Sequence, residues 1–426
     1  MDKFNIKIKK PNLFKYNIHD YYNEKNDDNF LPYLWTSAFG LLRLLKIFKS
    51  NLKIKTTKSE IEKYIFKVHS ILAIHSKKKL PLSDLIIDNL SWFSNLQVKD
   101  RELIDSLCST DNLKGSIRIG KFEQQEEGIG EEPGIYLHYC TKWAYGLIKT
   151  SQLLEDNMYL YQSANMMLTM CEKNINKDNN EYPRKMKEDL SEPEQTNEIA
   201  HDPLDVFIIL MNLIYCFIKQ EKNEEVKNLY LELLIDKLII NIPRIEELNN
   251  SPEKLENSDL LGVGFLFVSC YKIRILLNKF RSKIFKNNKL LDKLYRKYSY
   301  QDILELLKLL YLNLLNQSDI CNDKHIDFTE DIVHENAYRW FGISIGFQAI
   351  KNLQKLSSTI LNKNYKTNSL DFKTQKTIEK IMKIYHIRNN IHQNFNTYSY
   401  RKSNWNDHID INIVTYLYSK NPFFLF

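Results

Sequence analysis

The stretch "DPLDVFIILMNLIYCFIKQ", residues 202–220, decides the fold class. An almost unbroken apolar run follows an Asp-Pro start and ends at Lys-Gln, which is typical of a buried helix. Asp202 suits the N-cap, Pro203 the first helical position, and Asp205 the first turn, where its charge complements the helix dipole. We therefore predict a well-capped core helix, with His201 directly before it.

The same period of about 3.6 residues recurs along the chain, and only 116–122 hints at a strand. Further helices are predicted at 32–50, 58–76, 133–154 and 224–242, among others. Short polar loops join many of them, so the chain reads as a series of antiparallel helical hairpins. Such a series forms either an open solenoid or a closed ring, and no fixed-period repeat is visible.

Composition indicates a soluble globular protein that requires no disulfides. The 426 residues are 43% hydrophobic and 27% charged, and the six cysteines are scattered without a C-x-x-C pair. The N-terminus lacks the apolar core of a secretory signal, and the apolar run 206–218 is too short to span a bilayer. We expect a cytoplasmic location and no membrane partner.

Several short blocks in one order resemble an uncharacterised family of bacterial and fungal proteins in the six-hairpin glycosidase-like superfamily. The blocks are "RIGK" (118–121), "YLHYCTKW" (136–143), "KM" with "DLS-P" (185–193) and "HDPLD" (201–205). Val206 replaces a glycine that is usual in the family. The resemblance implies an all-α (α/α)6 toroid with long loops at one end of the ring, but no known reaction. We assign 1–30 to an N-terminal extension and 31–426 to one toroid domain.

In such a ring, sites are expected where the inner helices start and the long loops gather. Two long loops, 114–136 and 176–200, lead into predicted helix starts that carry His and aromatic residues. We expect a carbohydrate-active or carbohydrate-binding protein, with a glycosidase-like or sugar-epimerase-like site at the ring mouth. The candidate catalytic residues are His201, Asp202, His138 and Glu335. The candidate ligand-binding residues are Trp35, Tyr136, Trp143, Asp205, His334, Trp340, Arg118 and Lys142.

These residue types suit two reactions. Glycoside hydrolysis needs two carboxylates that flank the scissile bond. The candidates are Asp202, Asp205, Glu335, and either Glu131 or Glu132. Epimerase-like proton transfer would instead use a histidine as general acid and base, either His138 or His201.

Other kinds of site find little support. His138, Cys140 and His201 are of metal-ligand type, but no H-x-x-x-H or similar spacing unites them, so we expect no metal and no cofactor. A P-loop motif and a G-x-S-x-G motif are both absent from the sequence.

The alternative to a sugar site is a non-catalytic scaffold. The segment 272–297 holds ten Lys/Arg against one acid, within a chain of net charge +7. Interleaved aromatic residues make it a candidate surface for a protein or a polyanion, although nucleic acid is not the expected partner. The simpler interpretation is the solvated end of a helix pair.

Overall fold

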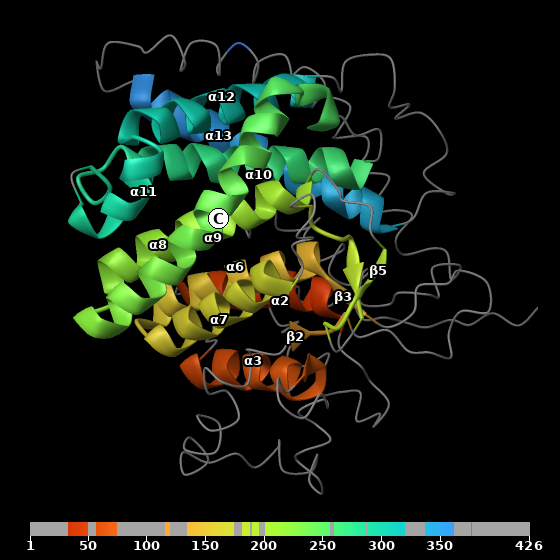
Figure 1. The fold of residues 1–426 in the computed structure, drawn as a ribbon. Helices are drawn as coiled ribbons and strands as arrows, with labels where there is room; N and C mark the ends of the chain where they lie inside the picture. The colour runs from red at the N-terminus through yellow and green to blue at the C-terminus, as the bar shows by residue number, and fades with distance from the viewer. Residues whose placement is uncertain are drawn as a thin grey trace, which may run out of the picture.

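The structure is a computed structural model that describes residues 33–49, 57–74, 116–119, 134–173, 181–187, 190–195, 201–255, 260–286, 288–319, 337–361 and 376. Within these ranges most residues are helical and two small sheets complete the fold (Figure 1). The prediction of an all-α protein is confirmed. The expected extension at 1–30 lies outside the described residues.

Five helices form an inner layer in which each packs against the next along the chain. They are α2 (Leu34–Lys49), α6 (Leu137–Leu154), α8 (His201–Gln220), α10 (Leu260–Phe280) and α13 (Ala337–Leu361). The pairs run parallel. Thr141 and Gln152 of α6 contact Asp205 and Cys216 of α8, so both helices advance by eleven residues between the two contacts.

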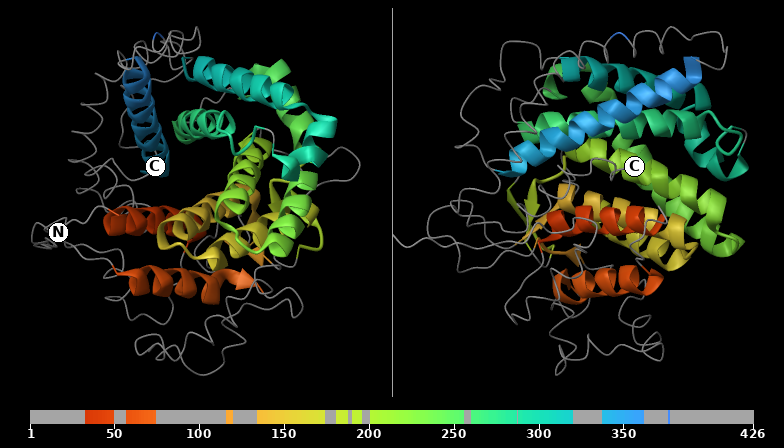
Figure 2. Two further views of the ribbon diagram at one scale, coloured as in Figure 1. Left: turned by 90° about the vertical axis from the view of Figure 1, so that its left-hand side faces the viewer. Right: turned by 180° about the vertical axis from the view of Figure 1, so that it is seen from behind.

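Four helices form an outer layer, and each follows an inner helix along the chain and packs on it. They are α3 (Lys58–Leu72), α7 (Asn157–Lys173), α9 (Glu224–Asn250) and α12 (Tyr300–Asp319). Short elements η4 (Pro252–Leu255), η5 (Lys289–Leu291) and α11 (Asp292–Lys297) lie beside α9 and α12. Figure 2 shows these helices from two further sides. Inner helices therefore alternate with outer helices along the chain.

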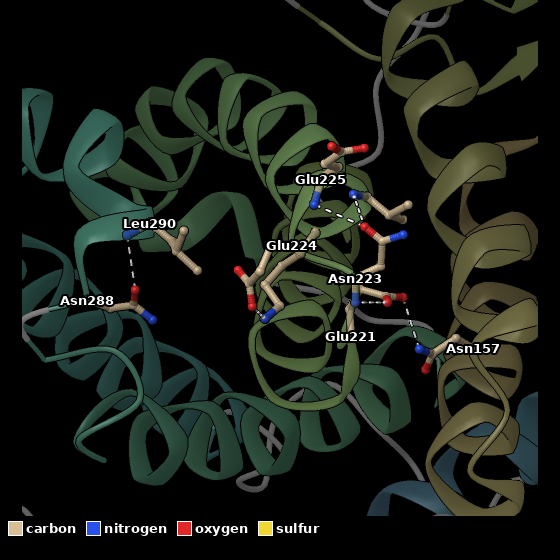
Figure 3. A network of polar contacts seen from close by, with 9 residues as sticks. Asn157, Glu221, Asn223, Glu224, Glu225, Asn288 and Leu290 are labelled. Carbon is tan, nitrogen blue, oxygen red and sulfur yellow. Dashed lines mark hydrogen bonds and ion pairs between the residues drawn. The ribbon is translucent and has the colours of Figure 1, made fainter.

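The turn between α8 and α9 shows how a hairpin is fixed (Figure 3). The buried carboxylate of Glu221 accepts hydrogen bonds from Asn157 Nδ2 at 2.9 Å, from the Asn223 backbone N–H at 2.8 Å, and from the Tyr161 hydroxyl. Asn223 then caps α9, because its Oδ1 accepts from the backbone N–H groups of Glu225 and Val226. These hydrogen bonds thus join the end of α8, the first turn of α9 and helix α7 of the neighbouring hairpin.

Helix α9 is longer than the sequence pattern indicates. The predicted helix 224–242 stops before Pro243, whereas α9 continues through Pro243 to Asn250. A proline removes one backbone hydrogen bond and disfavours a helix interior. Ile242, Ile245 and Leu248 are buried across this point, so packing of one face against the core outweighs the local cost.

Two small antiparallel sheets lie at the end where the inner helices begin (Figure 1). One pairs β1 (Ala73–Ile74) with β2 (Ser116–Ile117), so only two residues of the strand suggested at 116–122 form it. The other consists of β3 (Ile135–Tyr136), β4 (Lys185–Met186) and β5 (Pro193–Gln195), and β3 leads directly into α6.

Backbone hydrogen bonds join these segments to the start of α2. The Leu34 N–H donates to Ile119 O at 2.9 Å, and the Ile119 N–H donates to Gly134 O at 3.1 Å. A Cβ on Gly134 would lie 2.5 Å from Lys185 Cε and 3.0 Å from the backbone oxygen of Met186, so glycine leaves room for β4 at this point. The segment before α6 is therefore held close to the start of α2.

Among the described residues, two helices are long and apolar enough to cross a membrane: His201–Gln220 and Leu261–Phe280. The first helix extends beyond 206–218, the apolar run that is too short to span a bilayer. Both belong to the inner layer, and 78% and 61% of their most apolar windows are buried inside the protein. A core helix has this same composition, since each fully buried Leu, Ile or Phe side chain contributes about 1.5–3 kcal/mol to folding.

Candidate functional site

The start of α6 and the start of α8 lie beside one another and bring two predicted residues together. His138 Nδ1 lies 3.8 Å from Asp202 Oδ1. The Asp202 side chain is fully buried, whereas the His138 side chain keeps 22% of its exposure. At 3.8 Å the two atoms are close but beyond hydrogen-bond length. A buried carboxylate therefore stands beside a histidine that solvent can reach.

Asp202 does not occupy the position that its capping chemistry suggests. Helix α8 begins at His201, so Asp202 lies within the first turn rather than before it, and Pro203 is the third helical residue. The buried Asp202 carboxylate faces α6. Its favourable place near the positive end of the helix dipole is retained.

Both histidines at these helix starts are held neutral. Burial lowers the pKa of His138 well below its usual value, and the nearby positive charges of Lys142 and Arg184 lower it further. Burial also lowers the pKa of His201 to about 4, with Asp205 raising it and Lys142 lowering it to smaller extents. Within the described part of the chain, His138 Nδ1 and His201 Nε2 have no hydrogen-bond partner. Two neutral imidazoles are thus available to accept a hydrogen bond.

One turn further along α8, Asp205 is bound by α6. Thr141 Oγ1 and Lys142 Nζ each lie 3.4 Å from Asp205 Oδ2. Lys142 Nζ also donates to the His138 carbonyl at 3.0 Å and lies 4.4 Å from the centre of the Phe265 ring on α10. Asp202 and Asp205 therefore differ, because the first faces a neutral histidine and the second faces a lysine.

Tyrosine rings surround the His138 side of this cluster. The ring of Tyr136 lies 5.5 Å from His138, and the ring of Tyr139 lies 4.5 Å from it, both edge-on. The hydroxyls of Tyr139 and Tyr33 share a 2.6 Å hydrogen bond, which ties the start of α2 to the same group. Tyr139 was not among the predicted site residues. Its position next to His138 in "YLHY" was the only signal.

The sheet β3-β4-β5 contributes Tyr136 to this group and holds it in place. Lys185 of β4 pairs with Tyr136 of β3 across the sheet, and its ammonium lies 5.8 Å from the centre of the Tyr136 ring. Lys185 is buried and forms a 2.7 Å ion pair with Glu194 of β5. The "KM" block of the sequence therefore positions Tyr136.

Three other predicted ligand-binding residues take part in contacts that hold the fold together. Trp143 is fully buried, and its Nε1 donates to His69 Nε2 at 2.9 Å. Trp35 is 4% exposed and packs edge-on against Phe39 and Phe265. Arg118 lies beside β2, where its backbone N–H donates to the Leu72 carbonyl.

The remaining candidates fall outside the described residues. These are Glu131, Glu132, His334 and Glu335, together with the side chain of Trp340, whose backbone lies in α13. In the part of the chain that the structure describes, no group of three or more His, Cys, Asp or Glu could hold a metal ion.

The described cluster consists of two neutral imidazoles, one buried carboxylate, one lysine-bound carboxylate and a rim of tyrosines. Burial and the neighbouring positive charges keep the pKa of His138 low, so its imidazole stays neutral at 3.8 Å from Asp202. The arrangement is suited to binding polar groups and to proton transfer. No protein-family model, curated protein or solved structure matches this chain.

Proposed function

We propose that the protein binds a carbohydrate or another polyhydroxylated small molecule at the starts of α2, α6 and α8, within an (α/α)6 toroid. The observation that carries the proposal is the approach of His138 to Asp202 inside a rim of tyrosines. Parallel inner helices that alternate with outer ones support the toroid, because this pattern gathers inner-helix starts and loops at one end.

The chemistry of the cluster fits a sugar better than an apolar ligand. Hydroxyl groups both donate and accept hydrogen bonds, and the site offers neutral imidazole nitrogens and carboxylates for both roles. Tyr139, which is partly exposed, adds a ring that combines an apolar surface with a polar tip, and the buried Tyr136 ring packs beside it. A few convergent polar groups among aromatic side chains are the usual composition of a small-molecule site.

Two reactions follow from this site. In an epimerase-like reaction, neutral His138, 3.8 Å from Asp202, takes a proton from the ligand and then returns it, so the protein ends in its starting state. In a glycosidase-like reaction, two carboxylates act on the glycosidic bond. Of the described carboxyl groups, Asp202 and Asp205 stand one turn apart on α8, and Lys142 forms an ion pair with Asp205. The epimerase-like reaction uses the closer pair of groups.

The alternative, a scaffold that binds a polyanion through 272–297, receives less support from the packing. Lys272 and Lys279 of α10 are directed at tyrosine rings of α6 and α8. Lys293 of α11 forms a 2.6 Å ion pair with Asp236 of α9. The packing therefore engages these three lysines with neighbouring side chains, whereas Lys283, Lys286, Lys289, Arg296 and Lys297 are exposed.

A binding screen with glycans, free sugars and sugar phosphates tests the proposal. Wild type would be compared with His201→Ala, Asp202→Asn and the control Lys293→Gln, each checked for folding by circular dichroism. We expect ligands that bind wild type and Lys293→Gln, and that bind the two site variants at least about tenfold more weakly, the usual effect of one charged hydrogen bond. Equal binding by all four proteins would remove this site, and a screen without any sugar ligand would favour the scaffold.

A further inference from the structure

A second polar feature lies along the inner helices, beyond the His138 and Asp202 cluster. Four lysines project between neighbouring inner helices: Lys149 of α6, Lys219 of α8, and Lys272 and Lys279 of α10. We call this group the lysine face. Helices α6, α8 and α10 pack against one another in that order (Figure 1). The face is therefore assembled from segments that lie far apart in the sequence.

Two tyrosine rings organise the four ammonium groups into pairs. Lys149 Nζ and Lys272 Nζ lie 5.1 Å and 4.3 Å from the centre of the Tyr145 ring. Lys219 Nζ and Lys279 Nζ lie 5.8 Å and 4.6 Å from the centre of the Tyr215 ring. Each ring thus gathers one lysine from its own helix and one from α10, at distances typical of cation–π contacts.

Few negative charges of the described residues balance this face. Asp205, the acid that acts on Lys272, is already in contact with Lys142. Lys279 Nζ donates to the neutral amide oxygen of Asn212 at 2.8 Å, and Lys149 Nζ lies 3.4 Å from the amide oxygen of Gln152. The side chains that hydrogen-bond to these lysines are thus largely uncharged. The positive charges beside each lysine are those of the other lysines.

The pKa values of two of these lysines are lowered by burial and by the neighbouring positive charges. Burial lowers the pKa of Lys272 to about 8, opposed by Asp205 and reinforced by Lys142 and Lys149. Burial also lowers the pKa of Lys279 to about 8, with Lys149 and Lys219 contributing. Keeping the Lys272 and Lys279 ammonium groups charged therefore costs free energy in the absence of an anion.

We infer that the lysine face binds the phosphate groups of a small anionic molecule. Lysine serves as a point-charge ligand for phosphate, and several ammonium groups together suit a group that carries more than one negative charge. The arginine of α10, Arg274, lies over the Tyr311 ring of α12 and so belongs to a different contact. Two lysine pairs on adjacent rings suit a ligand with more than one negative charge.

The inference does not depend on the sugar site. The lysine face uses none of His138, His201 or Asp202, and Lys149 follows Lys142 by two helical turns, about 10 Å along α6. Loss of phosphate binding would leave the proposed sugar site untouched. Loss of sugar binding in Asp202→Asn would equally leave the lysine face intact.

Isothermal titration of the full-length protein with pyrophosphate, inorganic phosphate and citrate tests the inference. We expect pyrophosphate to bind most tightly and to weaken steeply with added salt. Lys272→Gln and Lys279→Gln should each weaken pyrophosphate binding about tenfold, because a charge-assisted hydrogen bond is lost. Lys272→Arg should retain most of the affinity. Lys293→Gln, a neutralised lysine of the same basic segment on the outer layer, should bind like wild type.

Reductive methylation of wild type gives a second measurement that needs no variant. Mass spectrometry should show that pyrophosphate protects Lys149, Lys272 and Lys279 but leaves Lys293 reactive. Absence of both binding and protection would overturn the inference. So would equal loss of affinity in Lys293→Gln, or citrate binding more tightly than pyrophosphate.

Discussion

The indole nitrogen of Trp143 donates a 2.9 Å hydrogen bond to Nε2 of His69, and both side chains are almost completely buried. Trp143 belongs to inner helix α6 and His69 to outer helix α3, so one polar contact joins the two layers near the start of the chain. Burial lowers the pKa of His69 to about 3, which keeps the imidazole neutral and able to accept the indole N–H.

Removing this hydrogen bond should destabilise the fold. Trp143→Phe leaves the buried His69 Nε2 without its donor, which costs about 1–3 kcal/mol, in addition to the loss of packed volume. Urea denaturation of wild type, Trp143→Phe, His69→Leu and the double variant measures the coupling between the two residues. We expect a coupling of about 1 kcal/mol, and strictly additive effects would show that the contact contributes nothing of its own.

Acid should weaken the protein before its carboxylates titrate. The pKa values of His69 and His201 are lowered to about 3 and about 4, and that of His138 is also lowered, so the unfolded chain binds protons near pH 6.5 that the folded chain does not. Above pH 6.5 these groups do not change the free energy of unfolding. As the pH falls from 6.5 toward their pKa values in the folded protein, the free energy of unfolding decreases. Each histidine contributes up to about 1.4 kcal/mol per pH unit between its two pKa values.

His69→Gln isolates one histidine in this effect. Glutamine can still accept the Trp143 N–H but does not titrate. Between pH 6.5 and pH 5, the difference in unfolding free energy between wild type and His69→Gln should shift by about 2 kcal/mol in favour of the variant. Urea titrations at both pH values measure this shift, and parallel pH dependence of the two proteins would place His69 in water.

Helical periodicity was enough to predict most elements of the fold. The apolar run after His201 corresponds to α8, and 133–154 corresponds closely to α6. The pattern was less reliable where tertiary packing overrides local preference, as at Pro243 inside α9. Which helices form the inner layer could not be predicted, because that depends on contacts between segments such as α10 and α13.

The candidate site was predictable in residue type but not in geometry. His138, His201 and Asp202 were singled out because they stand at predicted helix starts, and the structure brings them together. The burial of Trp143 and Trp35 depends on how α6 and α2 are rotated about their own axes. The residue type alone does not indicate this rotation. Lys272 and Lys279 could be read as solvated charges, because nothing in the sequence indicates that α10 turns them toward α6 and α8.

The cap of α9 should contribute measurably to stability. Asn223→Ala removes the Oδ1 atom that accepts from the N–H groups of Glu225 and Val226 and should cost about 1 kcal/mol, whereas Asn223→Gly should cost only a few tenths. Thermal unfolding followed by circular dichroism measures both. An unchanged melting temperature in Asn223→Ala would mean that the side-chain oxygen does not stabilise the start of α9.

Helices α10 and α13 approach one another closely at two facing glycines, Gly264 and Gly346. A Cβ added to Gly346 would lie 2.6 Å from Gly264 Cα and 2.7 Å from Gly264 O, both backbone atoms that cannot rotate away. Gly346→Ala should therefore force the two helices apart, at a cost of about 1–3 kcal/mol.

Gly146→Ala is the matched control, since a Cβ there would lie 2.9 Å from Leu41 Cδ2, the far end of a flexible side chain. Alanine is a better helix former than glycine by about 1 kcal/mol, so Gly146→Ala should be close to neutral. The sign of the change in urea midpoint decides the case. If Gly346→Ala raises the midpoint, helix propensity dominates and α10 and α13 do not pack backbone to backbone in solution.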